Sequence, residues 1–121
     1  LQTYSNPKLK YKNIPTYFDG IRYDSKKEAR KAFELKMLKM AGEIKDFKPH
    51  FKIDLMIDGK KVGKSYKVDF KIIHSDDTIE FLEVKSKFTA RLGDWKWKWG
   101  IVEKMFEKEI SEGSVRLTVE Y

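Results

Sequence analysis

Two short segments of the chain place acidic side chains beside a lysine. They are residues 67–70 and 81–85, and both are rich in the β-branched and aromatic residues that favour strands. In the second segment the side-chain period of two puts Glu83 and Lys85 on one face. If the first segment pairs beside the second, Asp69 joins them. Two carboxylates and a lysine are the set that holds Mg²⁺ against a phosphate, so the pattern predicts phosphate chemistry.

The length and composition predict a single domain. The chain has 121 residues, of which 40% are hydrophobic and 14% aromatic, as expected for one globular domain over residues 1–121. Residues 1–15 are rich in lysine and poor in apolar side chains, and we expect a mobile basic arm there. Cysteine is absent, which excludes disulfides and thiolate metal sites and fits a cytoplasmic location. No apolar run is long enough to predict a membrane helix or a signal-peptide core.

The net charge narrows the class of partner. It is +7 at pH 7, with a pI near 9.4, and such an excess favours polyanions through the release of counterions from phosphates. A soluble, lysine-coated protein without a ligand is the alternative that charge alone leaves open. An anionic membrane surface is disfavoured, because no predicted helix sets a purely basic face against a purely apolar one.

Turn residues and apolar spacing predict an alternation of strands and helices. Asp19-Gly20 suits a two-residue hairpin turn, and the capping-box pattern Ser25–Glu28 begins a helix that Gly42 ends. Asp94 is the expected N-cap of the last helix. The predicted order is a hairpin around residues 16–23, a helix over 25–42, strands over 47–57, 66–72 and 79–85, a helix over 94–111 and a strand over 115–119.

Both predicted helices carry an apolar stripe. The first stripe consists of Ala29, Ala32, Phe33, Met37, Met40 and Ala41. The last helix gathers Trp95, Trp99, Val102, Phe106 and Ile110 on the side expected to face the core. Trp97 falls nearly opposite, between Lys96 and Lys98. Three interpretations of Trp97 stay open: stacking on an unpaired base, covering a dimer interface, or being covered by the preceding basic loop.

At the acidic segments the sequence resembles the P-D-(D/E)-x-K nuclease superfamily. In that superfamily a metal-binding aspartate begins or bends one strand, and E-x-K lies on the next. Here Val68-Asp69 stands in the place of P-D, without the proline, and Glu83-Val84-Lys85 is the E-x-K. The resemblance implies an α/β, restriction-endonuclease-like αβββαβ core, a mixed central sheet flanked by two long helices, with a small N-terminal hairpin.

Further matches are similar to a small group of phage-encoded proteins regarded as endonucleases. They are Phe18-Asp19-Gly20-Ile21, Tyr23 to Ala29, Ala41-Gly42-Glu43-Ile44 and the Trp- and Lys-rich last helix. This resemblance implies a Mg²⁺-dependent DNA endonuclease, with Mn²⁺ expected to substitute, acting on branched DNA in the manner of a Holliday-junction resolvase. Its location would be the host cytoplasm. The alternatives are a non-catalytic nucleic-acid-binding protein on the same fold, and a nuclease acting on transposon ends or RNA.

The resemblance also assigns roles to residues. Asp69, Glu83 and the backbone carbonyl of Val84 would ligate Mg²⁺, and Lys85 would position or deprotonate the attacking water. Glu28 matches a glutamate near the start of the first helix that often completes the metal site; alternatively, it only caps that helix.

The expected DNA contacts surround this site in sequence. They are Lys67, Lys87, Arg91, Lys96, Trp97 and Lys98. Both histidines, His50 and His74, are interpreted as ordinary, because they lack a metal-ligand spacing. Selectivity for a junction would imply a homodimer, since two symmetric nicks need two active sites.

Overall fold

The computed structural model describes residues 2–3, 15–86 and 94–121. The chain divides into two compact units, Leu1–Glu43 and Ile44–Tyr121. Each unit has its own secondary structure and is described by itself. Of the predicted N-terminal arm, residues 1 and 4–14 lie outside the described residues.

The first unit combines a small antiparallel sheet with one helix. The strands are β1 (Gln2–Thr3), β2 (Thr16–Phe18) and β3 (Ile21–Tyr23), paired in the order β1-β2-β3. The predicted hairpin turn is confirmed between β2 and β3, where Asp19 and Gly20 have φ values of 54° and 79°. Two successive positive φ values are the mark of the turn that matches the twist of paired strands.

Helix α1 (Lys26–Met40) begins and ends where the sequence predicts. The side chain of Ser25 is the N-cap and accepts a hydrogen bond from the Glu28 N–H at 3.1 Å. Gly42 follows the helix with a φ of 79°.

The predicted stripe of α1 is partly wrong. Ala29 and Ala32 are buried, but they share their face with Leu35, whereas Phe33 is 45% exposed and packs edge-on against Phe18 at 5.8 Å. Met37 and Met40 also belong to the exposed side of the helix. The buried face carries a residue every three positions, at Ala29, Ala32 and Leu35, as one side of a helix allows. This face is rotated around the helix axis from the predicted one.

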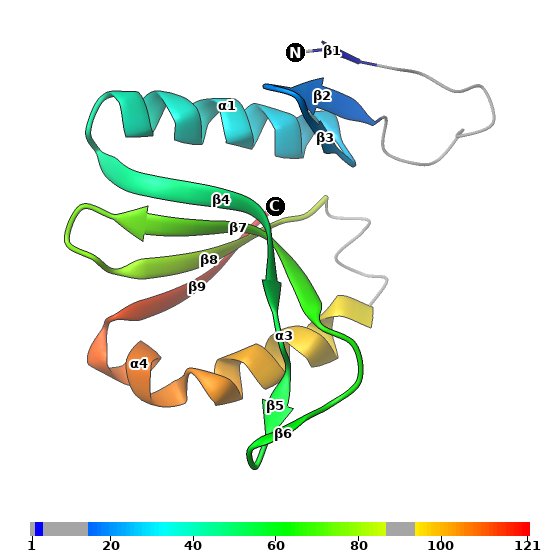
Figure 1. The fold of residues 1–121 in the computed structure, drawn as a ribbon, viewed down its shortest axis with the longest axis vertical. Coiled ribbons are helices and arrows are strands. Elements are labelled where there is room, and N and C mark those ends of the chain that lie inside the picture. The colour runs from blue at the N-terminus through cyan, green and yellow to red at the C-terminus, as the bar shows by residue number, and fades with distance from the viewer. Residues whose placement is uncertain (1, 4–14, 87–93) are drawn as a thin grey trace. The chain divides into compact units, whose positions relative to one another are not determined.

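The second unit is built on a mixed four-stranded sheet. Its strands are β4 (Ile44–Ile53), β7 (Tyr66–His74), β8 (Ile79–Val84) and β9 (Val115–Glu120), in the order β4-β7-β8-β9. The first three are antiparallel, and β9 runs parallel to β8 (Figure 1). A parallel neighbour needs a crossover, which the helices between β8 and β9 provide. The molecule is therefore an α/β protein with a mixed central sheet.

A short hairpin separates β4 from β7. It consists of β5 (Met56–Ile57) and β6 (Lys60–Lys61), and the prediction of one strand over residues 47–57 is therefore wrong. The continuous alternation of apolar residues hides the interruption, because Leu55 leaves the sheet yet remains fully buried in the core. The predicted turn at Asp58-Gly59 is present.

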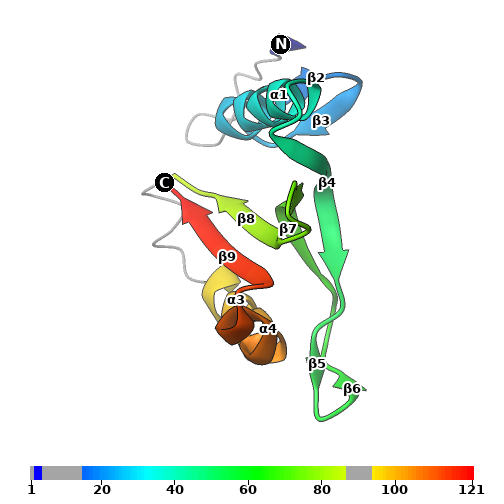
Figure 2. The same ribbon diagram turned by 90° about the vertical axis from the view of Figure 1, so that its left-hand side faces the viewer.

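Two helices cover one face of this sheet (Figure 2). They are α3 (Asp94–Met105) and α4 (Glu107–Glu112), so the single helix predicted over residues 94–111 is divided at Phe106, which has φ −105° and ψ 17°. The predicted stripe is nevertheless confirmed, since its residues all belong to or pack against the core cluster around Phe81 and Val102. The apolar period continues across the bend, which explains why the sequence does not reveal it. None of the described helices is long and apolar enough to span a membrane.

Candidate functional site

The candidate site lies where β7 and β8 part. The regular pairing of the two strands ends at Phe70 and Leu82. At the next position the backbone N–H groups bond to side chains of the opposite strand instead of to its backbone. The Asp69 N–H donates to Glu83 Oε1 at 3.2 Å, and the Val84 N–H donates to Asp69 Oδ2 at 2.7 Å. Each carboxylate is thus held by the backbone of the opposite strand. The predicted meeting of Asp69 and Glu83 is present in the structure.

Lys85 is fixed beside this pair. Its Nζ lies 3.2 Å from Glu83 Oε2 and 5.3 Å from the centre of the Trp95 ring. The Lys85 N–H donates to the Glu120 carbonyl at 2.8 Å, which continues the parallel pairing of β8 with β9. The ammonium is therefore held by a carboxylate on its own strand and by the face of an indole on α3.

Burial differs among the three charged side chains. The side chain of Glu83 is only 2% exposed and that of Lys85 17% exposed, whereas Asp69 is half-buried. A buried carboxylate is costly unless a charge or hydrogen bonds compensate it, and Glu83 has both. Asp69 and Lys85 are therefore the two side chains of the site that solvent reaches.

Tyr66, in the first position of β7, is a further residue of the candidate site. Its hydroxyl is buried and makes no hydrogen bond of regular geometry within the described part of the chain. Burial raises the pKa of Tyr66 well above its ordinary value, and the nearby carboxylate of Glu83, followed by that of Asp69, raises it further. The ring packs edge-on against Trp99 at 6.2 Å. Its only signal in the sequence is its position three residues before Asp69.

The donor set fits a hard divalent cation. Carboxylate and carbonyl oxygens are the ligands that Mg²⁺ prefers. Because Lys85 bonds to β9, the preceding residue, Val84, directs its backbone toward β7, as its N–H bond to Asp69 shows. Among the described residues no group of three or more His, Asp or Glu side chains is arranged to hold a metal. The oxygen groups of this unit that could hold such a cation are those of Asp69, Glu83 and the Val84 carbonyl.

Glu28 belongs to the first unit. There it is buried in the first turn of α1, with its N–H bonded to the Ser25 side chain. Burial, then Asp19 and then the Glu28 carboxylate raise the pKa of Tyr23 to about 12. The Ser25 half of the predicted capping box is therefore present, and both roles predicted for the Glu28 side chain, helix cap and metal ligand, stay predictions.

The predicted DNA contacts are placed in part. Lys67 is exposed on β7, and Lys96 and Trp97 are exposed on α3, where Trp97 is 54% accessible. Lys98 lies with its Nζ 5.5 Å from the centre of the Trp97 ring. Lys87 and Arg91 lie outside the described residues.

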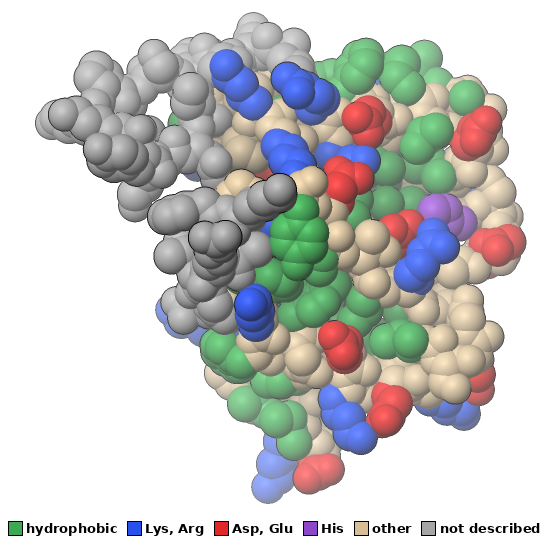
Figure 3. Space-filling view, turned by 180° about the vertical axis from the view of Figure 1, so that it is seen from behind, with side chains coloured by type: hydrophobic (Ala, Val, Ile, Leu, Met, Phe, Trp, Pro, Cys, Tyr) green, Lys and Arg blue, Asp and Glu red, His purple; other side chains and the backbone are tan. Residues whose placement is uncertain are grey.

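A separate polar cluster surrounds Glu80, on the face of β8 opposite to Glu83. Glu80 Oε1 lies 2.7 Å from His74 Nε2 and 3.0 Å from an Arg116 nitrogen. Burial acts to raise the pKa of Glu80, but hydrogen bonds from Thr118, His74 and Arg116 outweigh it and leave the pKa below its ordinary value. The view from behind shows a histidine among acidic and basic side chains (Figure 3).

His50 has an unusual backbone. It lies on β4 between the residue pairs Pro49–Phe70 and Phe51–Val68, level with Asp69, and its φ is 53°. A positive φ is uncommon for a residue other than glycine, and it interrupts the regular alternation of β4 at this level. The sequence offers no signal for this conformation.

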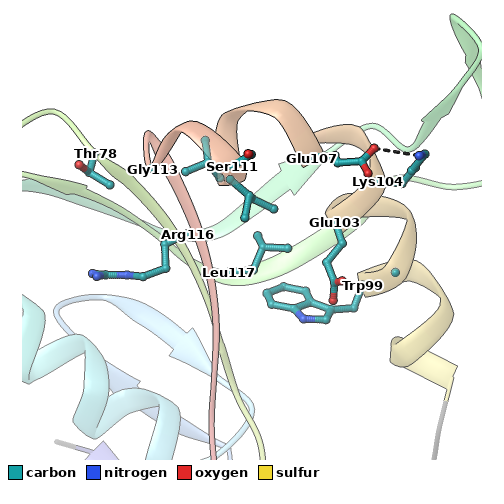
Figure 4. A pocket seen from close by; sticks show the side chains of 12 residues that line it. Thr78, Trp99, Glu103, Lys104, Glu107, Ser111, Gly113, Arg116 and Leu117 are labelled. Carbon is teal, nitrogen blue, oxygen red and sulfur yellow. Dashed lines mark hydrogen bonds and ion pairs between the residues drawn. The ribbon is translucent and has the colours of Figure 1, made fainter.

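A groove elsewhere in the second unit carries none of the predicted site residues. It has a volume of about 820 Å³ and lies between α3, α4 and β9 (Figure 4). Charges of both signs border it, including the ion pair of Lys104 and Glu107 at 2.8 Å. The groove is distinct from the carboxylate pair, because no residue of that pair lines it.

Comparison with known proteins gives a family without an assigned activity. No curated protein and no solved structure is significantly similar to the chain. A family model matches residues 8–118, a range that includes Asp69, Glu83 and Lys85. The chain therefore belongs to the family described as "Protein of unknown function (DUF1064)".

Proposed function

We propose that this protein is a Mg²⁺-dependent endonuclease that hydrolyses phosphodiester bonds in DNA. The observation that carries the proposal is the reciprocal bonding of Asp69 and Glu83, with Lys85 held 3.2 Å from Glu83. Two buried or half-buried carboxylates beside one lysine suit a metal and a phosphate better than a structural strand pair, whose stability needs neither. The net charge of +7 supports a polyanionic substrate.

Each residue has a definite task in this proposal. Asp69, Glu83 and the Val84 carbonyl hold the cation, which when bound polarises the phosphate and lowers the pKa of water. Lys85 orients the attacking water and stabilises negative charge on the phosphoryl oxygens. The water oxygen bonds to phosphorus as the bond from phosphorus to the 3′ oxygen breaks. The leaving oxygen takes up a proton, so the products are a 5′-phosphate and a 3′-hydroxyl.

Branched duplex DNA is the substrate class we propose, on the strength of the resemblance to phage-encoded endonucleases. A four-way junction is resolved by two symmetric nicks, so this substrate goes with a homodimer that supplies two sites. The exposed Trp97 beside Lys98 is a surface on which an unpaired base at a branch point would stack.

The first test removes the charges of the site. Asp69→Asn and Lys85→Ala are each expected to lower cleavage of a labelled four-way junction with Mg²⁺ by roughly 100-fold or more, the scale of losing one preorganised electrostatic group. Flap, linear duplex, single-stranded DNA and RNA substrates are compared in the same assay. Asp77→Asn and Lys45→Ala are matched controls, because these residues form an exposed ion pair away from the site. Undiminished cleavage by a folded Asp69→Asn protein would refute the proposal.

Thermal unfolding separates an enzyme from a binding protein on the same fold. A cation that binds only the folded chain raises its melting temperature. Mg²⁺ or Mn²⁺ is expected to stabilise the parent protein but not Asp69→Asn. DNA binding without any metal-dependent stabilisation would instead indicate a non-catalytic nucleic-acid-binding protein.

A further inference from the structure

The β5–β6 hairpin carries a concentration of lysines that the predicted DNA contacts do not include. We call residues 54–65 the lysine hairpin. These residues contain three lysines and two aspartates, and Lys52 and Lys67 flank them. The three lysines of the hairpin itself, Lys60, Lys61 and Lys64, are exposed. Together with its two flanking lysines, the hairpin is therefore a positively charged projection of the second unit.

Each face of the hairpin combines an apolar side chain with a lysine. The cross-strand partners are Met56 with Lys61 and Ile57 with Lys60, and partners in a hairpin lie on the same face. Met56 is 37% exposed and Ile57 49% exposed. Each side of this narrow ribbon therefore offers an apolar side chain for van der Waals contact and a lysine that can bind a phosphate.

The base of the hairpin is fixed to the core. Leu55 is fully buried, and the Val62 N–H donates to the Leu55 carbonyl at 2.8 Å. Asp54 accepts a hydrogen bond from the Ser65 hydroxyl and lies 3.5 Å from the Lys61 ammonium. The Ser65 hydroxyl, followed by Lys61, holds the pKa of Asp54 below its usual range.

The tip is equally well defined. Asp58 and Gly59 have φ values of 49° and 78°, which give the tight turn that suits a twisted two-stranded ribbon. Figure 2 shows β5 and β6 extending beyond β4 and β7. The hairpin is thus a projection with a fixed base and an exposed end.

Helix α3 connects the hairpin to the candidate site. At its start Trp95 contacts Lys85, and at its end the Met105 sulfur accepts a hydrogen bond from the Met56 N–H at 3.4 Å. The distance along the helix from Trp95 to Met105 is about 15 Å at 1.5 Å per residue. Along a duplex this corresponds to about four or five base pairs.

We propose that the lysine hairpin binds double-stranded DNA, entering a groove a few base pairs from the phosphate that is cleaved. The inference rests on the proposed function for the identity of the polyanion. A two-stranded β-ribbon fits the major groove, and its lysines reach the phosphates on either side. A protein partner would need a broader apolar patch than Met56 and Ile57 provide.

The test compares two double variants with the same change in charge. Lys60→Ala/Lys64→Ala removes two hairpin lysines and spares Lys61, which lies against Asp54. Lys45→Ala/Lys108→Ala removes two exposed lysines elsewhere in the second unit. Binding of the full chain to a labelled linear duplex is measured by fluorescence anisotropy in EDTA over a range of salt concentrations. Circular dichroism melts check that each variant is folded.

The hairpin variant is expected to bind roughly 10-fold more weakly and to flatten the plot of log K against log salt by about 1 to 2 units, as for two lost phosphate contacts. The control variant should change affinity much less. Ile57→Ser should weaken binding without changing the salt slope, because it removes an apolar contact. Equal losses in the two double variants, or no duplex binding by the parent protein, would overturn the inference.

This experiment is independent of cleavage. Intact duplex binding through the hairpin, with no metal-dependent hydrolysis, would refute the proposed chemistry and leave the hairpin as a DNA contact. Hydrolysis that depends on Asp69, with no effect of the hairpin lysines on DNA affinity or on the salt slope, would support the proposed chemistry and refute the hairpin as a DNA contact.

Discussion

Asp69 and Glu83 each bond to the backbone of the neighbouring strand, where two ladder bonds would otherwise lie. A carboxylate held in this way has its position set before any ligand arrives. Lys85 is set similarly, because Glu83 and the Trp95 ring contact its ammonium. Preorganised charges of this kind are the main means by which enzymes stabilise charge that develops during a reaction. The fixed positions of these side chains therefore support the proposed catalysis.

The buried hydroxyl of Tyr66 gives a prediction at the same scale. Since it makes no hydrogen bond of regular geometry within the described residues, Tyr66→Phe leaves no group without a partner. We expect the free energy of unfolding, measured by urea denaturation, to change by less than about 1 kcal/mol. A larger loss of stability would show that the hydroxyl donates a strong hydrogen bond to Glu83.

The two faces of α3 predict opposite responses to truncation. Trp99 is 8% exposed and belongs to the core, so Trp99→Ala should cost about 3–5 kcal/mol of unfolding free energy. Trp97 is 54% exposed, so Trp97→Ala should change it by less than about 0.5 kcal/mol. Chemical denaturation of both variants provides the comparison. A large loss in Trp97→Ala would mean that this side chain is buried in an assembly.

The elements are predictable from sequence where local chemistry determines them. Ser25 and Gly42 define α1, and the Asp-Gly pairs at Asp19 and Asp58 define two turns. The bend at Phe106 and the departure of Leu55 from the sheet were missed, because both residues keep the apolar period that the core requires. The spacing of apolar residues predicts which side chains are buried, but it does not predict where the backbone bends or leaves the sheet.

Part of the candidate site could also be predicted from the sequence. A period of two places Glu83 beside Lys85 on one strand, and the expected pairing of the two strands adds Asp69 as their partner. The bonds between the two strands depend on register, which follows from the whole sheet rather than from either segment. The contact of Lys85 with Trp95 depends on where α3 packs, so neither it nor the position of Tyr66 could be inferred from spacing.

At the scale of the whole molecule, charge and topology place the proposed chemistry in one unit. The carboxylate pair, Lys85 and the lysine hairpin all belong to residues Ile44–Tyr121. The sheet of this unit carries the carboxylate pair on two central strands, β7 and β8, and α3 spans from the neighbouring Lys85 to the hairpin. The proposed cleavage site and the proposed duplex contact therefore lie on one compact unit of the chain.

The stability of the whole molecule should depend on acid through Glu80. Its pKa in the folded protein lies below its ordinary value of 4.5, because Thr118, His74 and Arg116 favour the carboxylate more than burial disfavours it. The charged form therefore stabilises the fold above about pH 4.5, and this contribution disappears as the pH falls through the lower folded pKa. Glu80→Gln should reduce the free energy of unfolding near pH 7, and the difference from the parent should shrink on acidification.

Urea denaturation of parent and variant at a series of pH values measures this difference. Glu112→Gln is the matched control, because it makes the same substitution at an exposed position at the end of α4. It should remain close to the parent near neutral pH. A Glu80→Gln protein that is as stable as the parent near pH 7, or a difference that grows on acidification, would contradict the prediction. Either result would mean that the contacts of His74 and Arg116 with Glu80 do not outweigh the cost of burying its carboxylate.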